Sequence, residues 1–271
     1  MMTPPSVEEF KRSIRDFYCR HHRDLPWRRT TDPYQILVSE IMLQQTQVER
    51  VVEKFEAFLD RFPDLGTLAT ATTAEILIAW QGLGYNRRAL ALQQIAIRVI
   101  EDFDGILPAN DKDLRGLPGI GTYTAAAVLA FAFNQPVLLI ETNIRRVFIH
   151  CFFQNTSPVS DREIVPLVEK TLDRENPREW YNALMDYGWY LGTTIENPNR
   201  RSRHYQRQAP FEGSNRQIRG RILNLLVNGG ELSREDLTIV LDVPASRIDP
   251  LLRKLEAEGF LVVDYDRIRI R

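Results

Sequence analysis

The chain has 271 residues, of which 44% are hydrophobic, 26% charged and 10% aromatic. This is an ordinary globular composition, and it excludes a disordered, collagenous or disulfide-stapled protein. Its 35 Lys and Arg residues face 36 Asp and Glu residues, which leaves a formal net charge of -1. A nucleic-acid site would therefore have to be a local basic patch, because the chain has no global positive field.

Cysteine use and hydrophobicity limit the cofactors and the cellular setting. Cys19 and Cys151 are the only cysteines, which excludes both a disulfide framework and a site of four thiolates built from this chain. The stretch MMTPPSVEEF lacks the apolar core of a signal peptide, and the longest apolar run, residues 124–140, is too short to span a bilayer. We expect a soluble intracellular protein.

Helical periodicity dominates the first two thirds of the sequence. Apolar residues recur at helical spacing, as at Phe10, Ile14 and Phe17. Prolines such as Pro63 interrupt the pattern at short intervals, which predicts short helices joined by short loops. The sequence therefore predicts a mainly α protein with a helical domain over residues 1–195.

The composition shifts after this domain. Between Glu196 and Arg221 the arginines clearly outnumber the acidic residues. This bias predicts a basic linker over residues 196–213, with Arg200 and Arg201 as candidate phosphate contacts. The alternative is a solvated loop.

Residues 214–271 have the pattern of a small unit of their own. Apolar stripes such as Ile218 and Ile222 predict three helices, and the alternation that follows Phe260 predicts a hairpin. Three helices and a hairpin indicate a winged-helix-like module. Its third helix carries charges of both signs, so groove reading and partner binding both remain open. Since the module has its own apolar stripes, we expect that its removal leaves the helical domain folded.

A pair of glycines precedes one of the predicted helices. Gly119 and Gly121 come directly before the apolar helix that starts at Thr122. Glycines allow a tight turn, and the amides at the start of a helix point outward at the positive end of its dipole. This geometry can hold a phosphate without a basic side chain. A plain turn is the alternative.

Five motifs follow one another in an order found in a known family. The strings LPWR (25–28), SEIMLQQTQV (39–48), WQGLGYNRRAL (80–90), LPGIGTYTAAAV (117–128) and MDYG (185–188) resemble the helix-hairpin-helix DNA glycosylases, and within them the MutY-type adenine glycosylases. The resemblance implies two helical lobes, with the N-terminal segment packed against the lobe of residues 137–195. It also implies a cytoplasmic, nucleoid-associated monomer that binds double-stranded DNA carrying a mismatched or damaged base and has no membrane partner.

The resemblance assigns the chemistry to Glu40, Tyr123, Glu141 and Asn143. Base excision requires the nucleotide to be flipped out of the duplex, the base to be activated as a leaving group and the sugar cation to be stabilised. Glu40 matches the general acid that would protonate N7 of a flipped adenine, and its apolar neighbours favour the protonated form. Tyr123, expected to be hydrogen-bonded near Glu40, stands where bifunctional members carry a nucleophilic lysine. A phenol cannot form an imine, so the match implies a monofunctional enzyme.

Other motif positions match residues that contact DNA or the flipped base. Gln45 would fill the gap left by the base, Leu83 and Tyr85 would contact the opposite strand, and the first and last motifs would line the base pocket. The three pocket residues, Trp27, Arg28 and Asp186, could instead be ordinary core or surface. The expected contacts are Trp27, Arg28, Gln44, Gln45, Thr46, Leu83, Tyr85, Arg87, Gly119, Gly121, Thr122, Asp186, Arg200 and Arg201.

The sequence departs from the family pattern at three points. Glu141 replaces an aspartate that would stabilise the sugar cation, while Asn143 is kept. Gly192 stands where the first of four cluster cysteines would be, so we expect no iron-sulfur cluster. The winged-helix-like module replaces a domain that recognises 8-oxoguanine. The family hairpin also implies a monovalent cation, which here would be held by the carbonyl oxygens of Arg115, Leu117 and Ile120.

Three functional hypotheses follow. The first is a monofunctional glycosylase of base excision repair that removes adenine opposite G or a damaged G. The second is a thymine or uracil glycosylase for G mismatches, because related members with a tyrosine at position 123 do this work. The third is a non-catalytic helix-hairpin-helix DNA-binding protein, suggested by the altered residue 141.

Overall fold

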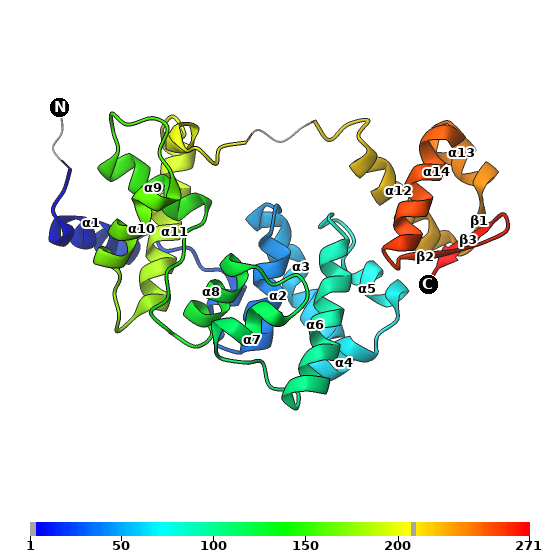
Figure 1. Ribbon diagram of the computed structural model, residues 1–271, viewed down its shortest axis with the longest axis horizontal. Coiled ribbons are helices and arrows are strands. Elements are labelled where there is room, and N and C mark those ends of the chain that lie inside the picture. The colour runs from blue at the N-terminus through cyan, green and yellow to red at the C-terminus, as the bar shows by residue number, and fades with distance from the viewer. Residues whose placement is uncertain (1–3, 207–209) are drawn as a thin grey trace. The chain divides into compact units, whose positions relative to one another are not determined.

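The computed structural model describes residues 4–206 and 210–271, and it is built of helices with one small sheet near the C-terminus (Figure 1). The described residues form two compact units. One unit contains residues up to Glu40, Pro108–Gly116 and Ile120 to residue 206. The other contains Ile41–Leu107, Leu117–Gly119 and residues 210–271.

The first unit is entirely helical apart from its loops and one isolated β-bridge. Its core forms where α9 packs on α11 and α1 packs on both α10 and α11. Phe10 anchors α1, with its ring 5.3 Å from that of Phe148 and 6.1 Å from that of Trp180. The elements are α1 (Val7–His21), η1 (Pro26–Arg28), the first part of α2 (Pro33–Leu43), α7 (Asp111–Gly116), α8 (Thr122–Phe131), α9 (Thr142–Phe152), α10 (Asp161–Thr171), α11 (Pro177–Thr194) and η2 (Pro198–Arg201).

The second unit combines a helical layer with the C-terminal module. Amphipathic helices pack α4 against α6 and α3 against α5. The elements are the end of α2, α3 (Val48–Arg61), α4 (Leu65–Thr70), α5 (Thr73–Ala79), α6 (Arg87–Phe103), α12 (Asn215–Gly229), β1 (Leu232–Ser233), α13 (Arg234–Leu241), α14 (Ala245–Ala257), β2 (Leu261–Asp264) and β3 (Arg267–Ile270).

The C-terminal module has three helices and an antiparallel sheet of order β1-β3-β2. Ile268 pairs with Leu232 on one side and with Val263 on the other. The side chain of Ile268 is buried, so the sheet covers the helices with its apolar face.

The module shares its core with the rest of the second unit. Leu77 of α5 is 4% exposed and belongs to the same apolar cluster as Ile218 and Ile222 of α12. Glu258 pairs with Arg87 of α6 and with Arg219 of α12. Burial would raise the pKa of Glu258, but these two arginines outweigh it and lower the pKa to about 2. The module is therefore docked on α5 and α6, and its removal would expose their apolar surface. That the helical domain stays folded without the module remains a prediction.

The start of the expected basic linker is a packed part of the first unit. Pro198–Arg201 forms η2 against α9, and Asn199 Nδ2 donates to the carbonyl oxygen of Thr142 at 2.9 Å. Val159 N donates to Arg201 O at 2.7 Å, and Arg203 N donates to Val159 O at 2.8 Å. These backbone bonds fix the segment, so residues 198–203 do not act as a linker. Residues 207–209 of the expected linker lie outside the described residues.

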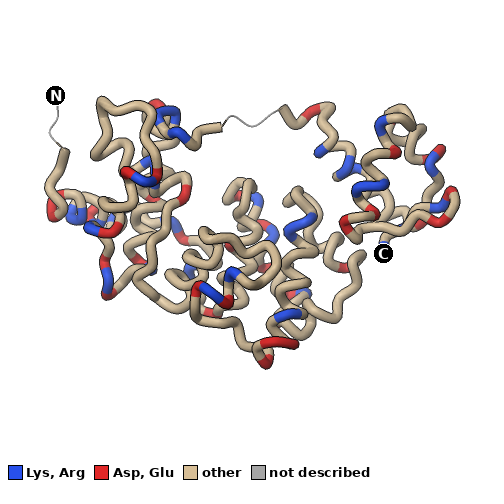
Figure 2. The backbone as a smooth tube through the Cα atoms, in the orientation of Figure 1, with Lys and Arg blue, Asp and Glu red and all other residues tan. Residues whose placement is uncertain are grey.

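Charges of both signs are spread along the described residues, as Figure 2 shows. Among the helices of residues 4–206 and 210–271, none combines the length and the apolar character needed to cross a bilayer.

Because α5 and the C-terminal module share a core, the effect of a substitution in α5 on stability should depend on how deeply the residue is buried. Leu77→Ala should lower the free energy of unfolding by about 2–5 kcal/mol, because it leaves a cavity between α5 and the C-terminal module. Ile78→Ala is the matched control: Ile78 lies on the same helix but is 45% exposed, so its effect should stay within about 0.5 kcal/mol. Urea unfolding measures both. Equal, small effects of the two substitutions would show that the module does not depend on α5.

Candidate active site

Glu40 lies in the most completely buried part of α2. Residues 36–42 are buried on all sides, and Glu40 itself is 5% exposed. Tyr123, the second residue of α8, donates a hydrogen bond from Oη to Glu40 Oε2 at 3.1 Å. Burial raises the pKa of Glu40 to about 7; the bond from Tyr123 opposes this shift and the charge of Glu141 adds to it. The result is a carboxyl group that holds a proton near neutral pH.

Tyr123 stays a proton donor in this environment. Burial raises the pKa of its phenol well above the usual value, and the charges of Glu40 and Glu141 act in the same direction. A neutral phenol can donate its proton to only one acceptor at a time. The bond to Oε2 therefore leaves the carboxyl proton of Glu40 to be carried on Oε1.

Glu141 caps the N-terminus of α9. Its Oε1 accepts from Asn143 N at 2.6 Å and from Ile144 N at 2.7 Å, while Asn143 Nδ2 donates to Oε2 at 3.2 Å. Burial raises the pKa of this carboxyl group, and the two amide bonds and the charges of Arg146 and Arg145 oppose the rise. The positive end of the helix dipole also favours the anion. Glu40 and Glu141 both lie in the first unit. Glu40 has a single hydroxyl donor, whereas Glu141 has backbone amide donors and two nearby arginines.

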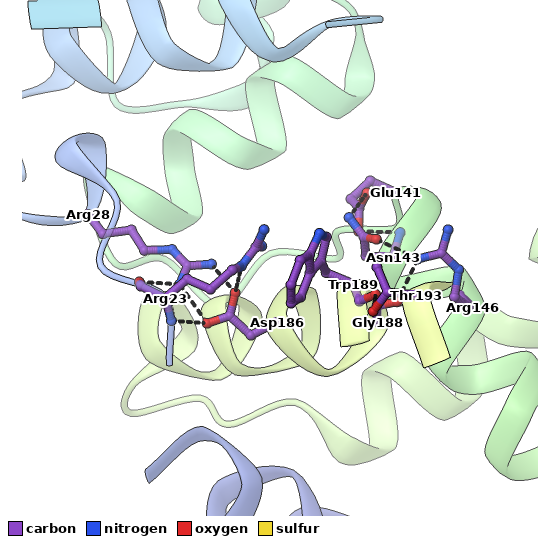
Figure 3. A network of polar contacts seen from close by, with 9 residues as sticks. All are labelled: Arg23, Arg28, Glu141, Asn143, Arg146, Asp186, Gly188, Trp189 and Thr193. Carbon is purple, nitrogen blue, oxygen red and sulfur yellow. Dashed lines mark hydrogen bonds and ion pairs between the residues drawn. The ribbon is translucent and has the colours of Figure 1, made fainter. Parts of the chain in front are cut away.

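Arg146 connects Asn143 to α11 and to the segment after it. Its Nη1 donates to Asn143 Oδ1 at 2.9 Å and to the carbonyl oxygen of Gly188 at 2.5 Å, and its Nε donates to Asn197 Oδ1 at 3.1 Å. Figure 3 shows Arg146 and Asn143 beside Gly188. A Cβ at Gly188 would lie 2.3 Å from Asn143 O, and one at Gly192 would lie 2.4 Å from Arg146 Nη1. Glycine is therefore required at position 188, where the neighbour is backbone, whereas a side chain at position 192 would displace the end of Arg146.

Arg28 and Asp186, both expected to line the base pocket, bind each other. Arg28 Nη1 and Nη2 donate to the two carboxylate oxygens of Asp186 at 2.7 and 2.8 Å, and Arg23 Nε donates to Oδ1 at 2.6 Å (Figure 3). The Asp186 side chain is 1% exposed. Burial would raise its pKa, but the bonds and charge of Arg28, with Arg23, hold the pKa below its usual range. Trp27 beside it is 7% exposed, and the Arg28–Asp186 pair joins η1 to α11.

Arg88 holds together the two loops expected to contact DNA. This arginine of α6 is 9% exposed and lies inside the second unit. Burial lowers its pKa to about 10, which leaves it charged at neutral pH. Its acceptors are the carbonyl oxygens of Ile41 (2.8 Å), Met42 (2.8 Å), Gln44 (2.5 Å), Leu83 (3.1 Å) and Gly84 (2.8 Å), together with Thr46 Oγ1 (3.0 Å). The guanidinium thus fixes the loop of residues 44–46 against the loop of residues 82–85.

The backbone of these two loops explains which side chains they present. Gln45 and Tyr85 adopt left-handed conformations, with φ of 57° and 48°, which ordinary side chains rarely adopt without support. Tyr85 is 37% exposed, whereas Leu83 is 2% exposed. Leu83 therefore packs in the core and is not a surface contact, while Tyr85 is presented at the surface.

Arg88 was missing from the residues predicted from the sequence, although a signal for it existed. It falls three, four and seven positions before the apolar stripe residues Ala91, Leu92 and Ile95 of the same helix. An arginine on an apolar stripe is buried, and a buried cation needs several acceptors.

The hairpin of residues 117–122 has both exposed and buried side chains. Gly119 has φ of 78°, so a side chain there would be strained. Gly121 precedes α8 as its N-cap residue, and it and Thr122 are exposed. Leu117 and Ile120 bury their side chains, at 4% and 6% exposed. The exposed start of α8 is therefore the part of this hairpin that can meet a phosphate.

Three of the expected DNA-contacting arginines differ in their availability. Arg201 donates to the carbonyl oxygens of Phe153 and Ile149 at the end of α9, so it is a structural residue. Arg87 pairs with Glu258 although its side chain is 60% exposed. Arg200 pairs with Glu196 at 2.9 Å, and both side chains are largely exposed; such a pair is weak and easily exchanged for a phosphate.

Comparison with known proteins identifies the family of this chain. Residues 38–170 match the model of the HhH-GPD superfamily base excision DNA repair protein. An adenine DNA glycosylase of Mycobacterium tuberculosis (strain CDC 1551 / Oshkosh) is 34% identical, with 92% of this chain and 89% of the relative covered. The human adenine DNA glycosylase is 34% identical over 72% of this chain and 37% of its own length.

Solved structures agree with this assignment. The structure of a thermostable thymine-DNA glycosylase matches with a TM-score of 0.64 and 28% identity, covering 72% of this chain and 91% of that one. A non-covalent endonuclease III–DNA complex matches with a TM-score of 0.60 and 18% identity, over 72% and 90% of the two chains, and supports the fold alone. The chain therefore belongs to the HhH-GPD superfamily of base excision DNA repair proteins, and it is a DNA-binding glycosylase.

Proposed function

We propose that this DNA glycosylase is monofunctional and hydrolyses the N-glycosidic bond of adenine opposite G or a damaged G in double-stranded DNA. The observation that carries the proposal is the buried Glu40–Tyr123 pair, in which the pKa of Glu40 is raised to about 7. Relatives that are named adenine DNA glycosylases and cover most of the chain support the choice of adenine. A monomer suffices, since the proposed catalytic residues all lie in one unit of one chain.

Glu40 would act first, as the general acid. Its carboxyl proton passes to a ring nitrogen of the flipped adenine, which becomes a neutral leaving group when the bond to the sugar breaks. Tyr123 holds Oε2 as an acceptor, so that the proton on Oε1 faces the base. Once the proton has left, the same hydroxyl donor stabilises the carboxylate that remains.

Glu141 would stabilise the positive charge that develops on the sugar. The amides of Asn143 and Ile144 fix its carboxylate before the reaction begins, so no reorganisation is needed when the charge appears. Asn143 Nδ2 steadies the second oxygen, and Arg146 holds Asn143 in place. Water then adds to the sugar cation and gives up a proton to the carboxylate of Glu40. Tyr123 offers no amine that could form an imine instead.

We further propose that the chain holds no iron-sulfur cluster. A 4Fe–4S cluster needs four cysteine ligands, and the sequence contains Cys19 and Cys151 alone. At Gly192, where the first ligand would stand, even a Cβ would meet the guanidinium of Arg146 at 2.4 Å. The residues present therefore do not fit the cluster. A monovalent cation on the carbonyl oxygens of Arg115, Leu117 and Ile120 stays a proposal for the hairpin.

Removal of thymine from G mismatches is the second candidate function. The thermostable thymine-DNA glycosylase is 28% identical over 72% of this chain, which favours this alternative. A panel of duplexes that carry each mismatch, assayed for the released base, separates the two. Release of thymine or uracil without release of adenine would replace the first proposal by the second.

The raised pKa of Glu40 predicts the pH dependence of excision. The single-turnover rate should fall as pH rises through about 7, because the protonated acid is lost there. Tyr123→Phe removes a hydrogen bond that lowers this pKa, so the alkaline limb of the profile should move to higher pH. Glu40→Gln should reduce the rate about 100-fold or more. A profile that is unchanged in Tyr123→Phe would contradict the coupling of the two residues.

Glu141 caps α9 and, in the proposal, also stabilises the sugar cation. A substitution that keeps the cap but removes the charge should therefore lower activity without lowering stability. Glu141→Gln keeps an oxygen that accepts the amide bonds, so the melting temperature should change little, while loss of the anion should slow excision by about 100-fold or more. Glu141→Asp shortens the side chain, and a displacement near 1 Å can slow the reaction on the order of 100-fold. Single-turnover rates and thermal melts measure both effects. Full activity in Glu141→Gln would remove this carboxylate from the mechanism.

The phenol at position 123 predicts base release without strand cleavage. Borohydride added during turnover should trap no covalent protein–DNA adduct, because no imine forms. Gel electrophoresis of the reaction detects such an adduct directly. A trapped species in the unaltered protein would show that an amine elsewhere attacks the sugar.

A further inference from the structure

Asn197 joins the segment after α11 to the side chain of Arg146, within the first unit. The Oδ1 atom of Asn197 accepts from Arg146 Nε at 3.1 Å and from Asn199 N at 3.1 Å. A carbonyl oxygen has two lone pairs, so these two bonds use its full capacity. Asn197 precedes η2, and the second bond caps that short helix. The same oxygen therefore starts η2 and fixes the direction of a guanidinium that belongs to α9.

Arg146 carries this constraint on to the carboxylate of Glu141. Its Nη1 donates to Asn143 Oδ1 at 2.9 Å, which turns the amide group of Asn143 so that Nδ2 donates to Glu141 Oε2 at 3.2 Å. Figure 3 shows the contacts of Asn143 with both residues. Burial raises the pKa of Glu141, and the charge of Arg146 is among the causes that oppose this rise. The geometry and the charge of Glu141 thus both depend on where Arg146 points.

The guanidinium of Arg146 lies in a space that α11 leaves open. A Cβ at Gly192 would collide with this guanidinium, and Gly188 O, one turn earlier, accepts from Nη1 at 2.5 Å. Gly192 is also the position where the first cysteine of an iron-sulfur cluster would stand, and the residues present do not fit that cluster. At this place the chain has instead a guanidinium held between α11 and the segment that begins at Asn197.

Asn199 ties the same segment to the backbone beside Glu141. Its side chain is buried, and its Nδ2 donates to Thr142 O at 2.9 Å. Thr142 is the first residue of α9 and directly follows Glu141, the N-cap residue. Because Asn197 holds the backbone N–H of Asn199, loss of the Asn197 side chain would loosen this connection as well as the one through Arg146.

We propose that Asn197 positions the carboxylate of Glu141 for excision by orienting Arg146. The inference rests on the proposed function, in which Glu141 stabilises the charge that develops on the sugar. A charged group stabilises a transition state best when it is fixed before the charge appears. Asn197 acts through Arg146 and not by contact with the reacting atoms. It is therefore a positioning residue, whose loss should slow the chemical step without weakening the binding of DNA.

Single-turnover excision rates and DNA affinities of the full chain test the proposal. Asn197→Ala removes the acceptor, and the resulting small displacement of Glu141 should slow excision about tenfold. The affinity for a duplex with a non-hydrolysable adenine nucleotide should stay within about twofold. Asn197→Asp keeps an acceptor oxygen for Arg146 and should restore most of the rate. Thr194→Ala is the control: it removes an exposed hydrogen bond to Tyr190 O and should change neither quantity.

A background without the Glu141 anion separates positioning from a general loss of structure. In Glu141→Gln, the further substitution Asn197→Ala should slow the remaining excision by less than about twofold, because both changes remove the same effect. Gly192→Ala keeps every polar group and favours the helix, but it pushes the guanidinium of Arg146 aside, so it should slow excision as Asn197→Ala does. An equal loss in both backgrounds, or unchanged rates in Asn197→Ala and Gly192→Ala, would overturn the inference.

A measurement without catalysis keeps this inference separate from the proposed function. The titration of isotope-labelled glutamate carboxyl groups is followed by NMR, with Glu141→Gln to assign the signal. The pKa of Glu141 should rise in Asn197→Ala, because burial raises it and Arg146 no longer opposes the rise from a fixed place. Arg145, the other arginine that lowers this pKa, stays bound to Asp161. An unchanged titration would overturn the inference, whereas absence of adenine release in the unaltered protein would refute the proposed function alone.

Discussion

The candidate DNA surface of the second unit consists of the loops of residues 44–46 and 82–85. Its shape depends on the hydrogen bonds that the buried guanidinium of Arg88 donates to both loops. A buried cation is tolerated only when its donors are satisfied, and Arg88 meets this condition with backbone carbonyl groups from two loops far apart in the sequence. The same bonds support the left-handed backbone at Gln45 and Tyr85. Lysine could not replace it, because a single ammonium group cannot reach acceptors spread around a planar fork. One side chain therefore sets the shape of both loops.

The two carboxyl groups of the candidate active site show how local surroundings divide the chemistry. Glu40 has apolar neighbours and one neutral donor, so burial dominates and it holds a proton near neutral pH. Glu141 lies at a helix N-terminus and accepts amide bonds that favour the anion. The negative charge of Glu141 in turn raises the pKa of Glu40. The charge of Glu141 thus favours the protonated form of the proposed acid.

Two regions that differ from the family pattern are integrated into the fold. Residues 198–203 pack on α9 and, through Asn199, bind the backbone next to Glu141. Asn197 and Gly188 bind Arg146, which holds Asn143. The C-terminal module buries Leu77 of α5 and brings Arg216 to Tyr85. Both regions therefore contact residues of the proposed active site or of the 82–85 loop.

The sequence by itself determined the helical class, the family and the identity of the pair Glu40 and Tyr123, because helical periodicity and long local motifs are encoded by neighbouring residues. It also indicated the three helices and hairpin of the C-terminal module. Partners distant in sequence were decided by the tertiary structure alone. The tertiary structure decides that Asp186 pairs with Arg28 and that Leu83 is buried. It also decides where Arg88 and Arg201 find acceptors, because packing brings backbone carbonyl groups within hydrogen-bonding distance of their guanidinium groups. Local patterns place a side chain on a helix or loop, but only the packed chain supplies what it binds.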